Sequence, residues 1–285
     1  MNRICWQRGV MHRLLIGSQA AALLWLMAVP AVVAAPPEPW AFWSPGDAAV
    51  TNRIDHSLWQ EFLGKAVILD DQAQMNLVRY RQLSSTDRIL LDDYLRAMQA
   101  IDPRGYSQAE QMAFWINLYN AVTVQVVLDH PDEHSIRDMG AGFFSRGPWS
   151  DELINVAGKE LTLDDIEHRI LRPLWKDRRI HFALNCASIG CPELAAAAYT
   201  AKNLDAMLAA AEVNYINSSR GVLFAGDSDL VVSSIFDWYA EDFAPDEEAL
   251  LAYLARNSEP LTRERLLEYR GPIRYQYDWS LNSSD

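Results

Sequence analysis

An apolar run near the middle of the chain constrains the fold more than any other feature. From Met112 to Leu128 the sequence is apolar nearly all round a helix, and such a helix must be buried. Ser107 followed by Glu110 predicts a capping box at its start. Asn117 and Asn120 lie on one face and need hydrogen-bond partners. Both amides are expected to tie down neighbouring loops, or Asn117 orients a catalytic group.

The segments around this central helix predict short strands as well as helices. Most of the strands come as hairpins, which predicts a single α+β domain with the buried helix packed on a small, mainly antiparallel sheet. The expected strands are 152–156 with 159–163, 222–224 with 230–232, 179–184 and 272–279. The other expected helices are 55–63, 84–98, 163–172, 194–198, 204–216, 236–243, 246–256 and 262–269.

The first 34 residues have the three-part pattern of a secretory signal peptide. Arginines precede an apolar stretch from Leu14 to Val33, and small residues end it at Ala34. An uncleaved membrane anchor is the alternative, but Pro30 and the small residues favour cleavage. The predicted organisation is a signal peptide over 1–34, an N-terminal lead with helices over 35–106 and a core domain over 107–282. We therefore expect a periplasmic or secreted protein with no membrane span after cleavage.

The charge of the chain excludes one class of partner. The formal charge is −13, and loss of the three arginines in the signal peptide lowers it to −16. Such a surface repels phosphate backbones, which argues against nucleic-acid binding. The acidity is explained by solubility alone.

Two cysteines remain after cleavage, because Cys5 is removed with the signal peptide. An oxidising compartment makes a disulfide between Cys186 and Cys191 the default expectation. It would pin the loop between them, and the closure of so short a loop would stabilise the fold by roughly 2 kcal/mol. It would also remove both thiols from catalysis.

A catalytic interpretation of the same segment stays open. On the predicted strand His181 precedes the loop that carries Cys186, and a thiol near an imidazole can become a nucleophilic thiolate. Glu167, Asp237 or Asn117 would orient the imidazole. A reversible redox pair and a metal site that includes His168 are weaker alternatives, because neither spacing matches a standard motif. No metal or other cofactor is expected.

Further polar residues around this segment are candidate ligand contacts. They are Asn185, Ser188, Arg179 and Asp237, although Arg179 also has many acidic residues with which to pair. Glu167 and His168 are neighbours on a predicted helix, so at most one of them is expected to face a shared site.

Several motifs in order resemble a known family. The chain is similar to the uncharacterised exported proteins grouped as domain of unknown function 547, with the family core over about 107–243. The motifs are Phe114-Trp115-Ile116-Asn117-Leu118-Tyr119-Asn120, Thr162-Leu163-Asp164-Asp165-Ile166-Glu167-His168, His181-Phe182-Ala183-Leu184-Asn185-Cys186-Ala187-Ser188 with Cys191-Pro192, Trp238-Tyr239 with Asp242-Phe243, and Tyr277-Asp278-Trp279-Ser280-Leu281-Asn282.

The resemblance implies little about activity, because the family has no settled function. Its helix-then-sheet order is similar to that of papain-like and transglutaminase-like hydrolases, with Asn117 on the central helix and His181 on a strand. This chain departs from them, since no mature cysteine lies in or before the central helix.

Two function hypotheses follow. The first is a hydrolase or transferase acting on peptide or small acyl or amide substrates, with Cys186 as nucleophile and His181 as base. The second is a non-enzymatic binding domain of the cell envelope, in which a Cys186–Cys191 disulfide is structural and the cleft beside His181 takes a peptide or small-molecule ligand.

Overall fold

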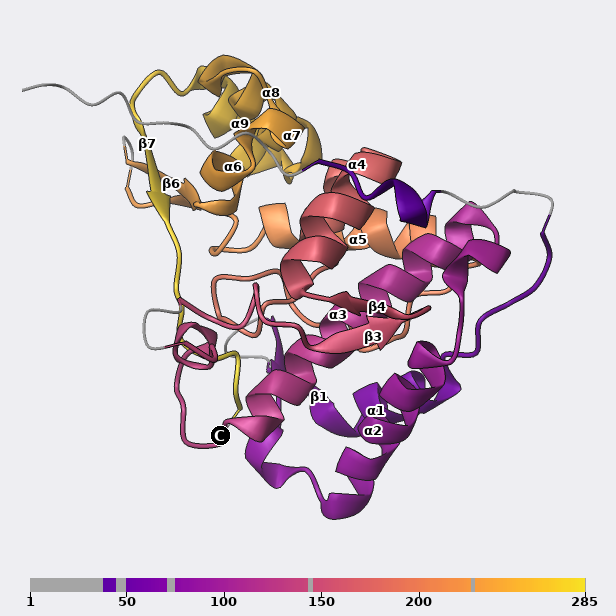
Figure 1. Cartoon of the computed structure of the whole chain (residues 1–285). Helices are drawn as coiled ribbons and strands as arrows, with labels where there is room; N and C mark the ends of the chain where they lie inside the picture. Colours follow the sequence, from indigo (N-terminus) through magenta and orange to yellow (C-terminus); the bar gives the residue numbers. More distant parts are fainter. Residues whose placement is uncertain (1–37, 45–49, 71–74, 143–145, 227–228, 285) are drawn as a thin grey trace, which may run out of the picture. The chain divides into compact units, whose positions relative to one another are not determined.

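The apolar run forms the predicted central helix, α3 (Gln108–Asp129), in the computed structural model of the chain (Figure 1). The structure describes residues 38–44, 50–70, 75–142, 146–226 and 229–284, so the predicted signal peptide lies outside the described residues. The side chain of Ser107 accepts a hydrogen bond from the Glu110 backbone N–H, at 3.4 Å. The other half of the predicted capping box is wrong, because the Glu110 carboxylate accepts the backbone N–H of Ile54 instead, at 3.1 Å.

Helices make up most of the described chain. α2 begins at a complete capping box formed by Ser84 and Asp87, and α2 packs against α3. The further helices are α1 (Ser57–Ala66), α2 (Ser85–Gln99), α4 (Arg172–Trp175), α5 (Leu204–Ile216), α6 (Ile235–Trp238), α7 (Ala240–Phe243), α8 (Glu247–Asn257) and α9 (Pro260–Glu268), with 3-10 turns η1 (Ala41–Trp43), η2 (Tyr80–Gln82), η3 (Pro103–Gly105), η4 (Ile136–Asp138) and η6 (Arg178–Phe182) and a π-helix, η5 (Asp165–Leu171).

The described strands form three small sheets, and the predicted α+β class is confirmed. Hairpins pair β1 (Val67–Asp70) with β2 (Met75–Val78) and β3 (Ile154–Val156) with β4 (Lys159–Leu161). The third sheet places β6 (Leu230–Ser233) in the centre. It pairs antiparallel with β5 (Val222–Phe224) and in parallel with β7 (Ile273–Gln276), so the C-terminal segment closes the sheet (Figure 1).

Two predicted elements are wrong. The segment 179–184 is no strand, because the Asp177 side chain accepts the Arg179 N–H and starts the 3-10 turn η6. The segment 194–198 is no helix either; its backbone forms bends, and the Ala198 N–H donates to the side chain of Gln60.

The buried apolar side chains form two clusters. The larger one surrounds α3 and includes Phe114 and Trp115, both fully buried. The smaller one contains Phe182, Phe236 and Tyr253, and many of its residues come from α6 to α9. None of the described helices combines the length and the apolar character that crossing a bilayer requires.

Candidate functional site

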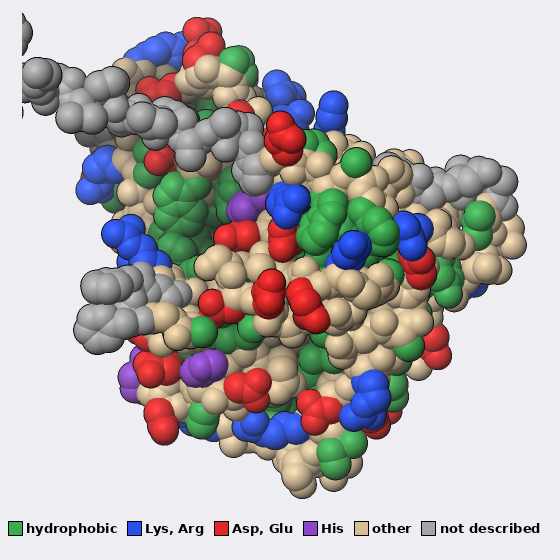
Figure 2. Space-filling view, viewed as in Figure 1, with side chains coloured by type: hydrophobic (Ala, Val, Ile, Leu, Met, Phe, Trp, Pro, Cys, Tyr) green, Lys and Arg blue, Asp and Glu red, His purple; other side chains and the backbone are tan. Residues whose placement is uncertain are grey.

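A cavity of about 290 Å³ brings the predicted reactive residues together where the two apolar clusters meet. Figure 2 shows hydrophobic side chains gathered on the face beside β6 and β7, next to acidic and histidine side chains. The cavity is lined by Tyr119, Trp149, Asp164, Glu167, His168, His181, Leu184, Cys186, Cys191, Pro192, Ile235, Trp238, Tyr239, Tyr277 and Trp279.

The loop that carries Cys186 is held by buried amides. The Asn120 side chain donates to the Ala183 carbonyl at 2.9 Å and accepts the Asn185 N–H at 2.8 Å. The Asn185 side chain donates to the Pro192 carbonyl at 2.7 Å and accepts the Ala187 N–H at 3.1 Å. These bonds fix the loop from both ends, with Ala187 in the left-handed region at φ 59°.

The C-terminal segment presses against the other side of this loop. The N–H of Gly190 donates to the Asp278 carbonyl at 2.8 Å, and a Cβ at this position would lie 2.7 Å from the Asp278 nitrogen. Only glycine therefore allows so close an approach. The contact places the Tyr277 hydroxyl 3.0 Å from the Cys186 sulfur.

The two cysteines are free thiols in the structure, so the predicted disulfide is not formed in it. The Cys186 backbone N–H donates to the Cys191 sulfur at 2.9 Å. The Cys186 sulfur lies 3.2 Å from the Ser188 hydroxyl, which donates to the Tyr277 hydroxyl at 2.9 Å. Because Ser188 gives its hydroxyl proton to Tyr277, the Tyr277 hydroxyl is free to donate to the Cys186 sulfur and is well placed to stabilise a thiolate.

The surroundings separate the acidities of the two thiols. A hydrogen bond with Cys191 lowers the pKa of Cys186; burial opposes this, and hydrogen bonds with Ser188 and Tyr277 lower the pKa further. Burial and the hydrogen bond with Cys186 raise the pKa of Cys191 well above its usual value. Cys186 is therefore the thiol that ionises first, and the thiolate is the nucleophilic form.

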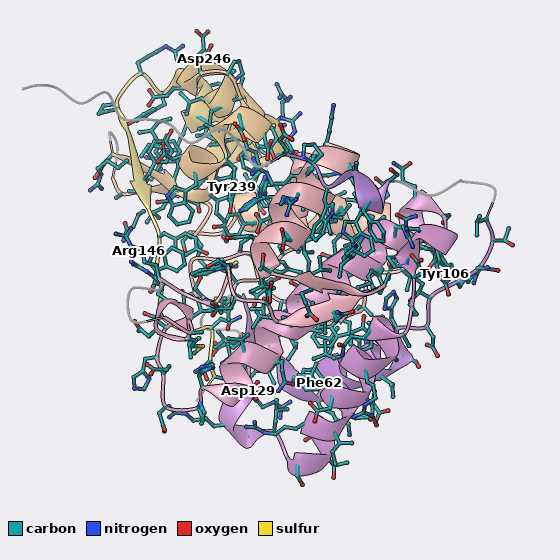
Figure 3. The ribbon with its side chains drawn as sticks, in the orientation of Figure 1. Phe62, Tyr106, Asp129, Arg146, Tyr239 and Asp246 are labelled. Atoms are coloured by element: carbon teal, nitrogen blue, oxygen red, sulfur yellow. The ribbon has the colours of Figure 1, made fainter. Side chains whose placement is uncertain are left out.

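His181 is buried and held between two carboxylates. Its Nε2 lies 2.7 Å from Asp242 Oδ2 and its Nδ1 lies 3.7 Å from Glu167 Oε1. The ring stacks on Tyr239 at a centroid distance of 4.1 Å, and Tyr239 is labelled in Figure 3 between α4 and the C-terminal helices. Arg172 Nε reaches the same Asp242 oxygen at 2.7 Å. His181 and Cys186 both line the cavity, but the ring nitrogens of His181 face carboxylates and the Cys186 sulfur faces hydroxyls.

Pairing of opposite charges dominates the ionisation of His181, Glu167 and Asp242. Burial lowers the pKa of His181, but hydrogen bonds to Asp242 and Glu167 outweigh burial and leave it raised. Burial raises the pKa of Glu167, yet the neighbouring histidines and Tyr239 bring it down to about 2. Asp242 behaves alike: burial raises its pKa, and His181 and Arg172 lower it to about 2. An imidazolium between carboxylates is the favoured state.

The π-helix η5 corrects another expectation. Glu167 and His168 both line the cavity, although neighbours on an α-helix would diverge. The wider turn of a π-helix reduces the angle between consecutive side chains, and such turns often occur at functional sites. Thr162 and Asp165 cap its start through reciprocal hydrogen bonds of 2.9 and 3.2 Å.

Several predicted site residues have other roles. Asn117 is fully buried and uses both ends of its amide on the Tyr199 backbone, at 2.7 and 3.0 Å, so it holds a loop and does not line this cavity. Arg179 pairs with Asp177 and Asp205 outside the cavity. Asp237 is exposed and does not line the cavity. Of the predicted binding residues, Asn185 shapes the loop, and only Ser188 contacts the thiol.

Sequence reasoning missed the two residues that complete the site, Asp242 and Tyr277. They lie 61 and 91 positions from their partners His181 and Cys186. The signal that could have found them is their place within the motifs Trp238-Tyr239 with Asp242-Phe243 and Tyr277-Asp278-Trp279. Within the part of the chain that the structure describes, no three His, Cys, Asp or Glu side chains are placed to hold a metal ion.

Comparison with protein families finds a match to part of the chain. Residues 103–216 match the family described as "Protein of unknown function, DUF547". The chain carries a DUF547 domain. The matched residues contain α3, η5, η6 and the cysteine loop, whereas Asp242 and Tyr277 lie beyond the matched part of the DUF547 domain. Searches of curated proteins and of solved structures found no match.

Proposed function

We propose that the protein is an exported thiol-dependent acyl-transfer enzyme, a hydrolase or transferase that acts on peptide or small acyl or amide substrates. The observation that carries this proposal is the setting of the Cys186 thiol, which lines the cavity. Its sulfur lies 3.0 Å from the Tyr277 hydroxyl and 3.2 Å from the Ser188 hydroxyl, and its pKa is lowered. The pattern of residues 1–34 supports export.

The residues support a two-step reaction. The Cys186 thiolate attacks the substrate carbonyl, a carbon–sulfur bond forms, and the amine or alkoxide leaves. His181, held as imidazolium by Asp242 and Glu167, supplies the proton that the leaving group takes. Water or an acceptor amine then attacks the thioester and returns its proton to His181. The Tyr277 hydroxyl, which accepts the Ser188 proton, donates to the thiolate and stabilises it before attack and after release.

Thiol titration of the natively exported protein tests the proposal. We expect two free thiols, with Cys186 alkylated by iodoacetamide at pH 6–7 about tenfold faster or more than an ordinary cysteine, because its pKa is lowered. Cys186→Ser should abolish the fast phase. Cys191→Ala should slow it, because the hydrogen bond from Cys191 that lowers the pKa of Cys186 is lost.

The same measurement distinguishes the alternative of a non-enzymatic binding domain of the cell envelope. The 2.9 Å contact from the Cys186 N–H to the Cys191 sulfur brings the two residues together and favours this second candidate. If the exported protein shows no thiol before reduction and two after it, the disulfide is structural and the nucleophile is excluded.

A further inference from the structure

Four aromatic rings form a continuous wall of the cavity. Trp238 stacks on Trp279 at a centroid distance of 5.5 Å and contacts Tyr277 at 4.8 Å. Tyr277 lies 4.6 Å from Trp279, and Trp149 meets Trp279 edge-on at 5.9 Å. Trp238 is 47% exposed, a large exposure for a tryptophan that also lines a cavity. A ligand can therefore reach the ring faces from solvent.

Carboxylates outnumber the imidazolium in the cavity lining, because Glu167 offsets His181 and Asp164 remains. Asp164 and Glu167 line the cavity, and no Lys or Arg of the described residues does. Glu167 is engaged with His181, whereas Asp164 is 48% exposed at its side chain and lies 3.7 Å from His168. The Asp164 backbone N–H donates to the Trp149 carbonyl at 3.0 Å, which holds this carboxylate beside the aromatic wall.

One ring of the wall already faces a cation from within the protein. The Arg137 guanidinium carbon lies over the Trp279 ring, 5.3 Å from its centroid. Aromatic faces attract cations through their quadrupole, and several faces with a carboxylate form a standard arrangement for binding ammonium groups. A neutral apolar ligand would gain nothing from Asp164.

We propose that Trp149, Trp238, Tyr277, Trp279 and Asp164 form a subsite for an ammonium group, so that the ligand of this cavity is a cationic amine compound. Its place beside Cys186 as a substrate subsite rests on the proposed function. An acyl or amide substrate would then carry a positive charge near the reacting carbonyl, or an amine acceptor would enter through this wall. Binding itself needs no thiol chemistry.

The test compares a cation with its neutral isostere. Choline and 3,3-dimethylbutan-1-ol have the same shape and differ in charge. Calorimetric titration of the Cys186→Ser variant of the full exported chain should show that choline binds about tenfold more tightly than the neutral alcohol does. Trp238→Leu should weaken choline binding about tenfold, whereas Trp238→Phe, which keeps an aromatic face, should keep most of it. Asp164→Asn should also weaken choline, and Asp92→Asn, a change at an exposed carboxylate on α2, should not.

Two results would overturn the subsite. One is equal affinity for choline and the alcohol, and the other is an equal loss in Trp238→Leu and Trp238→Phe. Circular dichroism confirms that each variant is folded. Because the titration uses a chain without the Cys186 thiol, a negative result would not contradict the proposed reactivity of Cys186. A slow Cys186 in the alkylation experiment would likewise leave the ammonium subsite standing.

Discussion

At the scale of single residues, the ionisation of His181 is the property that the proposed chemistry needs most. An imidazole between a carboxylate at 2.7 Å and a second at 3.7 Å is held charged, even though it is buried. Of these two carboxylates, Asp242 makes the shorter contact. It also receives Arg172, which keeps it ionised. The acidity of His181 thus depends on Glu167 inside the matched DUF547 segment and on Asp242 outside it.

Replacement of this carboxylate should shift the titration of His181. Asp242→Asn removes the closest negative charge, so the pKa of His181 should fall by about one unit or more. The measurement is the NMR titration of the histidine ring protons. Asp237→Asn removes an exposed acid of the adjacent helix α6 and should leave the midpoint unchanged. An unaltered His181 midpoint in Asp242→Asn would show that Asp242 does not set its charge.

At the scale of elements, the central helix acts through two amides one turn apart. Asn120 fixes Ala183 and Asn185 beside the loop that carries Cys186, and Asn117 fixes Tyr199 further along. Both are buried to the same degree, with 2% and 0% exposure. They therefore form a matched pair in which only one amide supports the thiol.

Truncation of each amide separates stability from site geometry. Asn120→Ala and Asn117→Ala each leave a buried backbone donor and acceptor unpaired, which should lower the free energy of unfolding by about 2–4 kcal/mol. Only Asn120→Ala should also slow alkylation of Cys186, because its loop loses its anchor. Urea unfolding and iodoacetamide kinetics measure the two effects. Equal thiol reactivity in both variants would contradict the role of Asn120.

How far the sequence predicts the fold differs from element to element. The all-round apolarity of α3 is a local signal, and the prediction of a buried helix is confirmed. The segment around His181 has the apolar residues of a strand, but the Asp177 cap and the amide of Asn120 turn it into a 3-10 helix. The second of these determinants comes from 63 positions away, so no local pattern predicts it.

The candidate site likewise contains some residues that sequence patterns predict and others that they do not. His181, Glu167 and the two cysteines are close in sequence or follow one another in motifs, and the structure brings them to one cavity. Asp242 and Tyr277 come from segments that reach the site only through the third sheet and the C-terminal chain. Nothing in the type of either residue marks it as part of a site, and its position depends on the completed fold.

At the scale of the whole molecule, the charges of Glu167, Asp242 and His181 also contribute to the free energy of unfolding. Glu167 and Asp242 have pKa values of about 2 in the folded protein, against about 4 when unfolded. They contribute stability above their unfolded pKa and lose it as the pH falls toward 2. The raised pKa of His181 has the opposite sign: its contribution is complete below about 6.5 and is lost as the pH rises through the folded value.

The opposite pH dependences of the carboxylates and of His181 predict a maximum of the unfolding free energy between about pH 4.5 and 6.5, where all three groups are charged. Urea unfolding from pH 3 to pH 9 measures it. Glu167→Gln removes a buried charge from its partner, so it should cost about 3 kcal/mol at pH 5.5 and flatten the acid side of the profile. Asp92→Asn, on the exposed face of α2, should leave the profile unchanged. A wild-type profile that is flat from pH 3 to pH 7 would mean that Glu167 and Asp242 are not ionised in partnership with His181, and the imidazolium required by the proposed mechanism would lose its support.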